Sequence, residues 1–260
     1  SREAIVPCDM RDLLINRGTL LVINEALLEQ GRVDDEQRRA LVRHAAKAII
    51  GYGDTLLFFR GRYHWSYVEK RRRVAELRDV PTSFRQLYEE ASAFRFEPDY
   101  DAMTARDLPS WLREVRGQLS EVHLACEAIR LGTPGLRWSE YCERVLRHAI
   151  VEGGLRARVW MRKVRNAVRF RPRLLPVLGW REQLGLRLGG GRGLLAAVFP
   201  CVAYGVGGEP GQALTRQLLD VSGSPSELRR AYLRHWGEVS DPNFAHLVRR
   251  LGLVLEARGE

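Results

Sequence analysis

Apolar residues recur at helical spacing along most of the chain. From Asp9 to Gln30 they fall three or four positions apart, as on one face of a helix, and Gly31 then supplies a stop. A second amphipathic stretch, from Asp34 to Phe59, is apolar enough to predict a central helix of a bundle. No run of alternating apolar and polar residues is bounded by hairpin turns. The pattern therefore predicts an all-α fold, a multi-helix bundle of about nine or ten helices.

Residues that cap helices mark where several of these elements begin and end. Four pairs have the spacing of a capping box, in which two side chains bond each other's backbone at a helix start: Asp34 and Gln37, Ser66 and Glu69, Ser83 and Gln86, and Ser224 and Glu227. Gly61 suits a left-handed C-terminal cap, because it has no Cβ to clash at positive φ. Residues 60–65 are therefore predicted to form a tight corner between two helices.

A glycine-rich stretch at residues 184–193 suggests a division of the chain. Four of the five residues 189–193 are glycines, which predicts a flexible joint. On this interpretation residues 1–183 form a helical bundle and residues 194–260 a smaller C-terminal lobe. The alternative is a loop that cradles phosphate, but no strand precedes it and the Lys-Ser/Thr pair of a P-loop is missing.

Positive charge is concentrated in one segment of the chain. The formal net charge is +10, and residues 153–173, which contain no acid, carry +8 of it. Within a predicted helix over residues 155–170, four arginines at 4-3-4 spacing share one face: Arg158, Arg162, Arg165 and Arg169. We expect the opposite side to be packed: Ala157, Trp160, Met161, Val164 and Val168.

The arginine face predicts binding of a polyanion such as a nucleic acid or a nucleotide, or of an acidic protein surface. Two alternatives are a solvated face and one neutralised by Glu140 and Glu143; a basic amphipathic helix can also rest on a membrane.

A second positive cluster, residues 70–73, directly follows the predicted corner. Together with Arg60 and Arg62 it could form a positive pocket near Tyr63 and His64. We therefore count Arg62 and Arg72 as further candidate phosphate-binding residues, and His64, Arg60 and Asp54 as weak catalytic candidates.

Signatures of catalysis and of metal binding are incomplete. Three segments match the R-x(4–6)-H motif of HEPN ribonucleases, a match that an arginine-rich chain produces by chance: Arg39 to His44, Arg116 to His123 and Arg230 to His235. The acidic triplet at residues 99–101 has the D-x-D form but lacks the Gly-Ser turn that nucleotidyl transfer needs before it. The four cysteines lie far apart, which argues against a zinc site and a disulfide scaffold and predicts reduced, mostly buried thiols in a cytoplasmic protein. We expect no metal and no cofactor.

The N-terminal quarter resembles a known helical module. The stretches CDMRDLLINRGTLLVINEALLE and KAIIGYGDTLLFFRGRYHWSYVEK resemble the region that follows the catalytic domain in nucleotidyltransferase-fold proteins of the kanamycin-nucleotidyltransferase and minimal-nucleotidyltransferase type. The resemblance covers about residues 9–75. The residues that carry the resemblance are Lys47, Ala48, Gly51, Gly53, Asp54, Leu57, Gly61, Tyr63, Ser66, Glu69 and Lys70. In that family the module packs on the catalytic domain, helps to close the substrate site and is related to HEPN bundles.

The resemblance implies a cleft shared with a catalytic portion. The family's G-S…D-x-D motif is absent here, so that portion would lie upstream of Ser1 or in a partner chain. The residues that would face the cleft are Asp54, Arg60, Arg62, Tyr63 and His64. In the structural alternative, Asp54 and Arg60 form a salt bridge while Tyr63 and His64 hold the corner.

The sequence thus favours a non-catalytic helical module of a nucleotidyltransferase-like protein, binding a phosphate-bearing ligand or nucleic acid through its arginine face. The alternatives are a free-standing nucleic-acid-binding protein and a HEPN-like ribonuclease. The longest apolar stretch, residues 193–205, contains Pro200 and is too short to predict a transmembrane segment.

Overall fold

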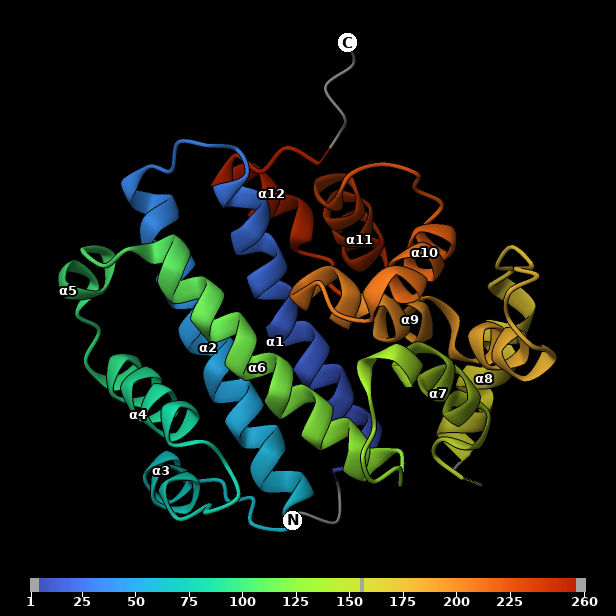
Figure 1. The fold of residues 1–260 in the computed structure, drawn as a ribbon, viewed down its shortest axis with the longest axis horizontal. Coiled ribbons are helices and arrows are strands. Elements are labelled where there is room, and N and C mark those ends of the chain that lie inside the picture. Colours follow the sequence, from blue (N-terminus) through green and yellow to red (C-terminus); the bar gives the residue numbers. More distant parts are fainter. Residues whose placement is uncertain (1–4, 155–156, 256–260) are drawn as a thin grey trace. The chain divides into compact units, whose positions relative to one another are not determined.

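The computed structural model describes residues 5–154 and 157–255, and every regular element in these two ranges is a helix (Figure 1). The all-α prediction is confirmed, but the described ranges contain twelve helices rather than nine or ten. The first six are α1 (Pro7–Leu28), α2 (Asp35–Phe59), α3 (Tyr67–Ala75), α4 (Thr82–Phe96), α5 (Tyr100–Thr104) and α6 (Leu108–Arg130). The next six are α7 (Trp138–Val151), α8 (Ala157–Arg169), α9 (Trp180–Tyr204), α10 (Gly208–Leu219), α11 (Pro225–Val239) and α12 (Phe244–Leu251).

Three of the helices, α5, α9 and α10, lie in segments for which the sequence pattern predicted no helix. α5 is short, and it begins where the Asp99 carboxylate accepts a hydrogen bond of 2.9 Å from the backbone N–H of Ala102. The D-x-D triplet thus starts a helix, and Asp99 caps it. α10 begins with glycine and proline, which conceal a helix when only propensity and spacing are considered.

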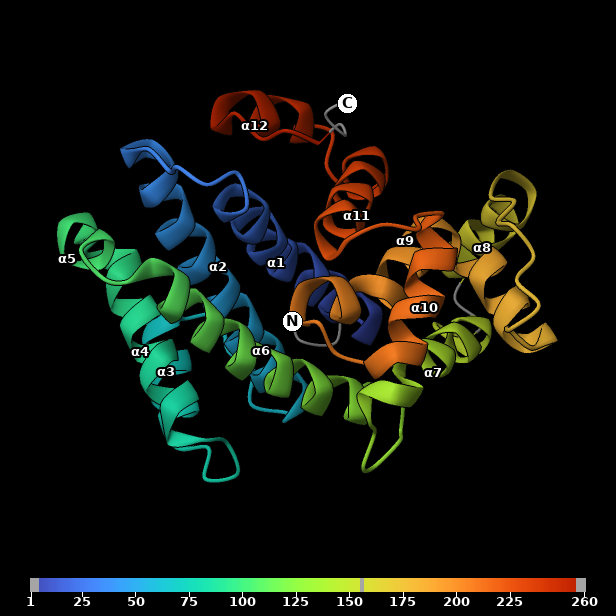
Figure 2. The same ribbon diagram turned by 45° about the horizontal axis from the view of Figure 1, so that its top comes forward.

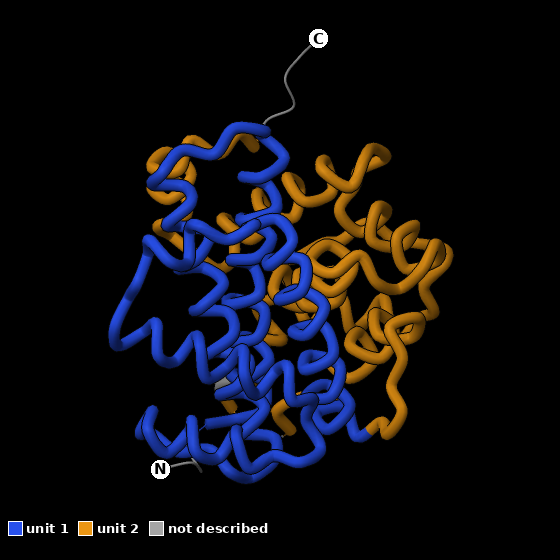
Figure 3. The backbone as a smooth tube through the Cα atoms, turned by 60° about the vertical axis from the view of Figure 1, so that its left-hand side comes forward, with its two compact units in different colours: residues 1–132 blue, residues 133–260 orange. Residues whose placement is uncertain are grey.

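The chain divides into two compact units, residues 1–132 and residues 133–260 (Figure 3). The boundary follows α6, far from the predicted joint at residues 184–193. That glycine-rich stretch lies instead inside α9 of the second unit.

The first unit is built around α2, as its apolar pattern predicts. α2 contacts α1, α3, α4, α5 and α6 (Figures 1 and 2), and Leu41, Ile49 and Tyr52 on it are fully buried. α4 comes close because Gly53 has no side chain: a Cβ there would overlap the ring of Tyr88. The small-residue face of α2 therefore admits an aromatic ring from its neighbour.

The corner after α2 has the predicted C-terminal cap. Gly61 adopts φ 74°, its backbone N–H donates to the carbonyl of Phe58 at 3.0 Å, and that of Arg62 donates to the carbonyl of Leu57 at 2.8 Å. This pair of bonds is a Schellman motif, which satisfies carbonyls left free at the helix end. Ser66 is the N-cap residue of α3, as predicted, but its side chain makes no capping hydrogen bond, so the predicted capping box with Glu69 is wrong. The Glu69 carboxylate instead accepts hydrogen bonds from Arg72 and Arg73. The predicted capping boxes at Asp34 and Ser224 are both confirmed. The predicted cap at Ser83 is wrong, because α4 already begins at Thr82 with Pro81 as its N-cap residue.

The second unit is built around α9, which contacts α7, α8, α10 and α11. Its glycines allow close packing. A Cβ on Gly185 would overlap the backbone carbonyl of Leu146 in α7, and one on Gly190 would approach the side chain of Asn166 in α8 to 2.7 Å. Gly190 also has φ 63° and ψ −160°, so α9 is kinked there.

α9 is long and apolar enough to cross a membrane by length and composition alone. Of its most apolar window 67% is buried within the protein, as expected of a core helix. This helix is therefore weak evidence for a membrane span.

The glycine packing predicts opposite effects of one substitution at two sites in α9. Gly185→Ala should destabilise the protein by about 1–3 kcal/mol, because the new methyl group would force α9 away from α7. Gly193→Ala is the matched control: no atom lies within 4 Å of a Cβ there, and alanine favours the helix by up to about 1 kcal/mol. Urea unfolding measures both, and equal effects at the two positions would contradict close packing at Gly185.

Candidate functional site

The basic helix α8 is held in place by polar side chains. The Lys163 amine donates a hydrogen bond of 2.6 Å to the carbonyl of Ile150, in the last turn of α7. The Asn166 amide donates one of 2.9 Å to the carbonyl of Leu188, just before the kink in α9. Lys163 and Val159 are buried, and burial lowers the pKa of the Lys163 amine. These residues form the packed face of α8.

The apolar residues of α8 point outward, so the prediction of a packed apolar side is wrong. Trp160, Met161, Val164 and Val168 are 48%, 65%, 57% and 65% exposed, and Ala157 is exposed as well. The physical reason is the supply of acceptors: helix-end and kink carbonyls need donors, and Lys163 and Asn166 provide them where a valine could not. The outward apolar residues are called the apolar face of α8 below.

The arginines of α8 lie between the packed face and the apolar face, since successive residues turn by about 100° around a helix. Arg165 and Arg169 are exposed and Arg162 is half-buried, whereas the side chain of Arg158 lies outside the described part of the structure. Among the described residues, Arg162, Arg165 and Arg169 form no ion pair.

Acidic residues on the neighbouring helix do not neutralise this arginine face. Glu140 lies 3.3 Å from Arg144 and 3.5 Å from Arg137, and Glu143 lies 3.7 Å from Arg147. Both carboxylates are thus engaged by arginines of α7 or of its N-cap. Neither Glu140 nor Glu143 therefore pairs with Arg162, Arg165 or Arg169.

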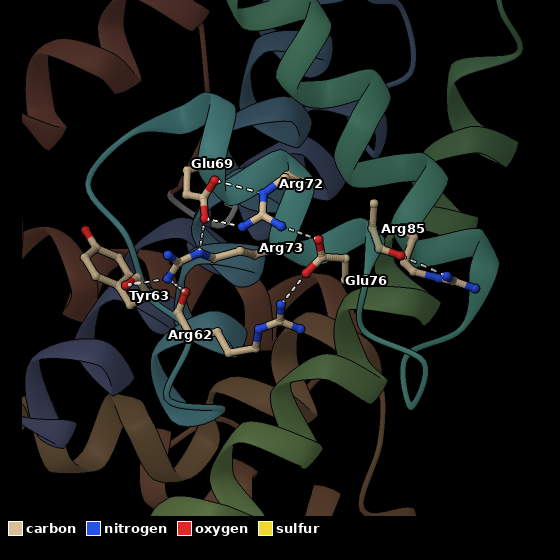
Figure 4. A network of polar contacts seen from close by, with 8 residues as sticks. Arg62, Tyr63, Glu69, Arg72, Arg73, Glu76 and Arg85 are labelled. Atoms are coloured by element: carbon tan, nitrogen blue, oxygen red, sulfur yellow. Dashed lines mark hydrogen bonds and ion pairs between the residues drawn. The ribbon is translucent and has the colours of Figure 1, made fainter.

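The second predicted cluster, around the corner between α2 and α3, is ion-paired (Figure 4). Arg72 lies 2.6 Å from Glu69 and 2.5 Å from Glu76, and Glu76 also pairs with Arg62. Arg73 shares Glu69 at 2.6 Å and donates a hydrogen bond of 2.8 Å to the backbone carbonyl of Arg62. The hydrogen bonds from Arg72 and Arg73 hold the pKa of Glu69 down at about 2. Arg62 and Arg72 are therefore both ion-paired within the first unit.

The weak catalytic candidates are engaged by three separate sets of partners. Asp54 pairs with Lys70 at 2.6 Å rather than with Arg60, which pairs with Asp79 at 2.5 Å. His64 accepts a hydrogen bond of 3.0 Å from the backbone N–H of Ser66, and its ring stacks on Trp65. Each candidate thus has a local structural partner.

The Asp54–Lys70 pair is a buried salt bridge that joins α2 to α3, and it is called the buried pin below. Lys70 is only 3% exposed, and its amine lies 4.8 Å and 4.6 Å from the ring centroids of Tyr63 and Tyr67. The Tyr88 hydroxyl donates to the other Asp54 oxygen at 3.3 Å. Burial raises the pKa of Asp54 although Lys70 opposes the shift. The resembling residues Asp54, Tyr63 and Lys70 thus meet in one cluster.

Sequence reasoning did not single out Lys70 as buried or Tyr88 as its neighbour. Lys70 begins a run of four basic residues, which reads as a solvated surface. A signal for Tyr88 was present in Gly53, because a glycine inside a helix often admits a large side chain.

The histidines of two R-x(4–6)-H matches lie in the core of the first unit. His44 is buried, as its apolar neighbours predict, and its Nδ1 lies 2.9 Å from the side-chain oxygen of Asn24. Burial lowers the pKa of His44 to about 3 and that of His123 to about 4. Arg116, the partner of His123 in the motif, pairs with Glu25 at 2.6 Å.

The described residues contain no group of three or more His, Cys, Asp or Glu side chains that could hold a metal ion. Burial raises the pKa of the Cys142 thiol to about 12 and also raises that of Cys126. These thiols stay protonated near neutral pH and are weak nucleophiles.

No protein-family model matches the chain, and searches of curated proteins and of solved structures return no significant match.

The buried pin predicts a difference between neighbouring basic residues of α3. Lys70→Met should cost about 3–5 kcal/mol of unfolding free energy, because it leaves the Asp54 carboxylate buried without its counter-ion. Arg71→Met removes a largely exposed pair with Glu89 and should cost less than about 1 kcal/mol. Chemical denaturation compares the two, and similar small losses would show that the pin contributes little.

Proposed function

We propose that this chain is a non-catalytic helical module that binds phosphate groups through the arginine face of α8. The observation that carries the proposal is the absence of ion pairs on Arg162, Arg165 and Arg169 within the described residues. Around the α2–α3 corner, by contrast, each of Arg60, Arg62 and Arg72 has a carboxylate partner.

Like charges three and four residues apart on a helix repel each other by a few tenths of a kcal/mol per pair. Within the described part of the chain, no acid pairs with Arg162, Arg165 or Arg169 to relieve this repulsion. Phosphate oxygens would relieve it, and the planar guanidinium group binds phosphate with two parallel hydrogen bonds. A ligand with several phosphates in a row fits the row of arginines better than a single anion.

We further propose that the module belongs to a nucleotidyltransferase-like protein whose catalytic portion is elsewhere. Support comes from the residue pattern over positions 9–75, which falls on α1, α2, the corner and α3. The non-catalytic part of the proposal is supported by Asp54, Arg60 and His64, each of which has a separate local partner.

The test uses labelled single-stranded RNA as a generic phosphate polyanion, because non-specific binding depends on charge rather than on sequence. The wild-type protein should bind at low salt, with an affinity that falls steeply as salt rises. Arg162→Glu/Arg165→Glu should remove most of this binding and flatten the dependence of log Kd on log salt by about 1–2.

The matched control is Arg78→Glu/Arg113→Glu, which changes the net charge equally at two exposed arginines of the first unit. It should retain most of the affinity. Equal losses in both double variants would attribute binding to total charge, and no binding by the wild-type protein at low salt would reject the phosphate-binding face.

A further inference from the structure

Exposed large hydrophobic side chains are concentrated in the segment that carries the basic helix. Among the described residues, nine of the fourteen such side chains lie between residues 151 and 184. Scattered exposed apolar residues are normal on a protein surface, but a concentration of this kind marks an interaction site.

The apolar face of α8 forms a strip along one side of the helix. Trp160, Met161, Val164 and Val168 fall within about 100° of arc, and the arginine face begins next to it. Turning α8 to bury this strip would withdraw Lys163 and Asn166 from the carbonyls that they bind. The two hydrogen bonds therefore keep the strip exposed to solvent.

The connection between α8 and α9 is also apolar and free of acidic residues. Leu174, Val177 and Trp180 are largely exposed there, and Figures 1 and 2 show this connection and the first turns of α9 beside α8. No acid occurs between residues 153 and 181. The surface is therefore both apolar and cationic.

We propose that α8 docks in the plane of an anionic lipid bilayer. The apolar face enters the boundary between headgroups and acyl chains, while the arginine face binds lipid phosphates. A helix with an apolar strip, tryptophan and flanking arginines is the kind that lies at a membrane interface. The lipid-phosphate part rests on the proposed function, and the apolar part is independent of it.

Charge favours a bilayer over a second copy of the chain as the partner. Residues 153–173 carry a net charge of +8, so pairing two apolar faces would bring two such segments together. An anionic membrane attracts each basic side chain near its surface. A nucleic acid would engage the arginines but leave the apolar face in water.

The experiment is sedimentation with vesicles of phosphatidylcholine containing about 30% phosphatidylglycerol, and with vesicles of phosphatidylcholine alone. The wild-type protein should bind the anionic vesicles, and tryptophan fluorescence should shift to shorter wavelength. Val164→Asn/Val168→Asn leaves the charge unchanged and should lower the anionic-vesicle partition coefficient about tenfold, with RNA binding at low salt unchanged. Val68→Asn, at an exposed valine of α3, is the control and should behave as the wild type.

The outcomes separate the two proposals. RNA binding without vesicle binding would overturn the membrane inference and leave phosphate binding intact, and failure of both would reject both. Vesicle binding that is equal in the wild type and the valine double variant would overturn insertion of the apolar face. Concentration-dependent dimers that the valine variant abolishes, without vesicle binding, would overturn the inference in favour of self-association.

Discussion

Two hydrogen bonds from side chains to backbone carbonyls determine how α8 is presented, and the functional account depends on them. Lys163 reaches the end of α7 and Asn166 reaches the kink of α9. A buried carbonyl without a donor costs about 1–3 kcal/mol. The orientation of α8 that packs Lys163 and Asn166 inward is therefore favoured over the one that packs its valines inward. As a result, the apolar face is exposed next to Arg162, Arg165 and Arg169, which form no ion pair among the described residues. The need to satisfy backbone acceptors thus produces a surface on α8 that is both apolar and positively charged.

The two basic regions of the chain differ in whether their arginines have acidic partners. At the α2–α3 corner, acids of α3 and of the following loop form ion pairs with Arg60, Arg62 and Arg72, and the buried Asp54–Lys70 pair joins the two helices. On α8, Arg162, Arg165 and Arg169 form no ion pair among the described residues, and Glu140 and Glu143 are paired with arginines of α7 and its N-cap. The distribution of charge along the sequence does not distinguish these two regions, but the ion pairs in the structure do.

The parts of the fold that the sequence predicts well depend on local physics. The end of α2 follows from Gly61, its start follows from the Asp34 capping box, and its central place follows from its apolar length. Outcomes that depend on non-local partners were not predictable. The glycine-rich stretch reads as a joint until Leu146 and Asn166 are seen against it.

The candidate site divides in the same way. The position of the arginine face follows from 4-3-4 spacing, which needs only the helix period. The outward direction of Trp160 and Val164 does not follow, because an amphipathic pattern normally turns its apolar side to the core. Only the carbonyls at Ile150 and Leu188, contributed by other helices, reverse that choice.

The most direct test of this account is the reactivity of single cysteines introduced into α8. Val164→Cys should react with a maleimide at least about tenfold faster than Val159→Cys in the folded protein, because position 164 is exposed and position 159 is buried. The four native cysteines are buried or half-buried, and labelling of the wild-type protein measures their background. Fast reaction at position 159 and protection at position 164 would mean that α8 packs its apolar side inward, and the exposed apolar face would then be contradicted.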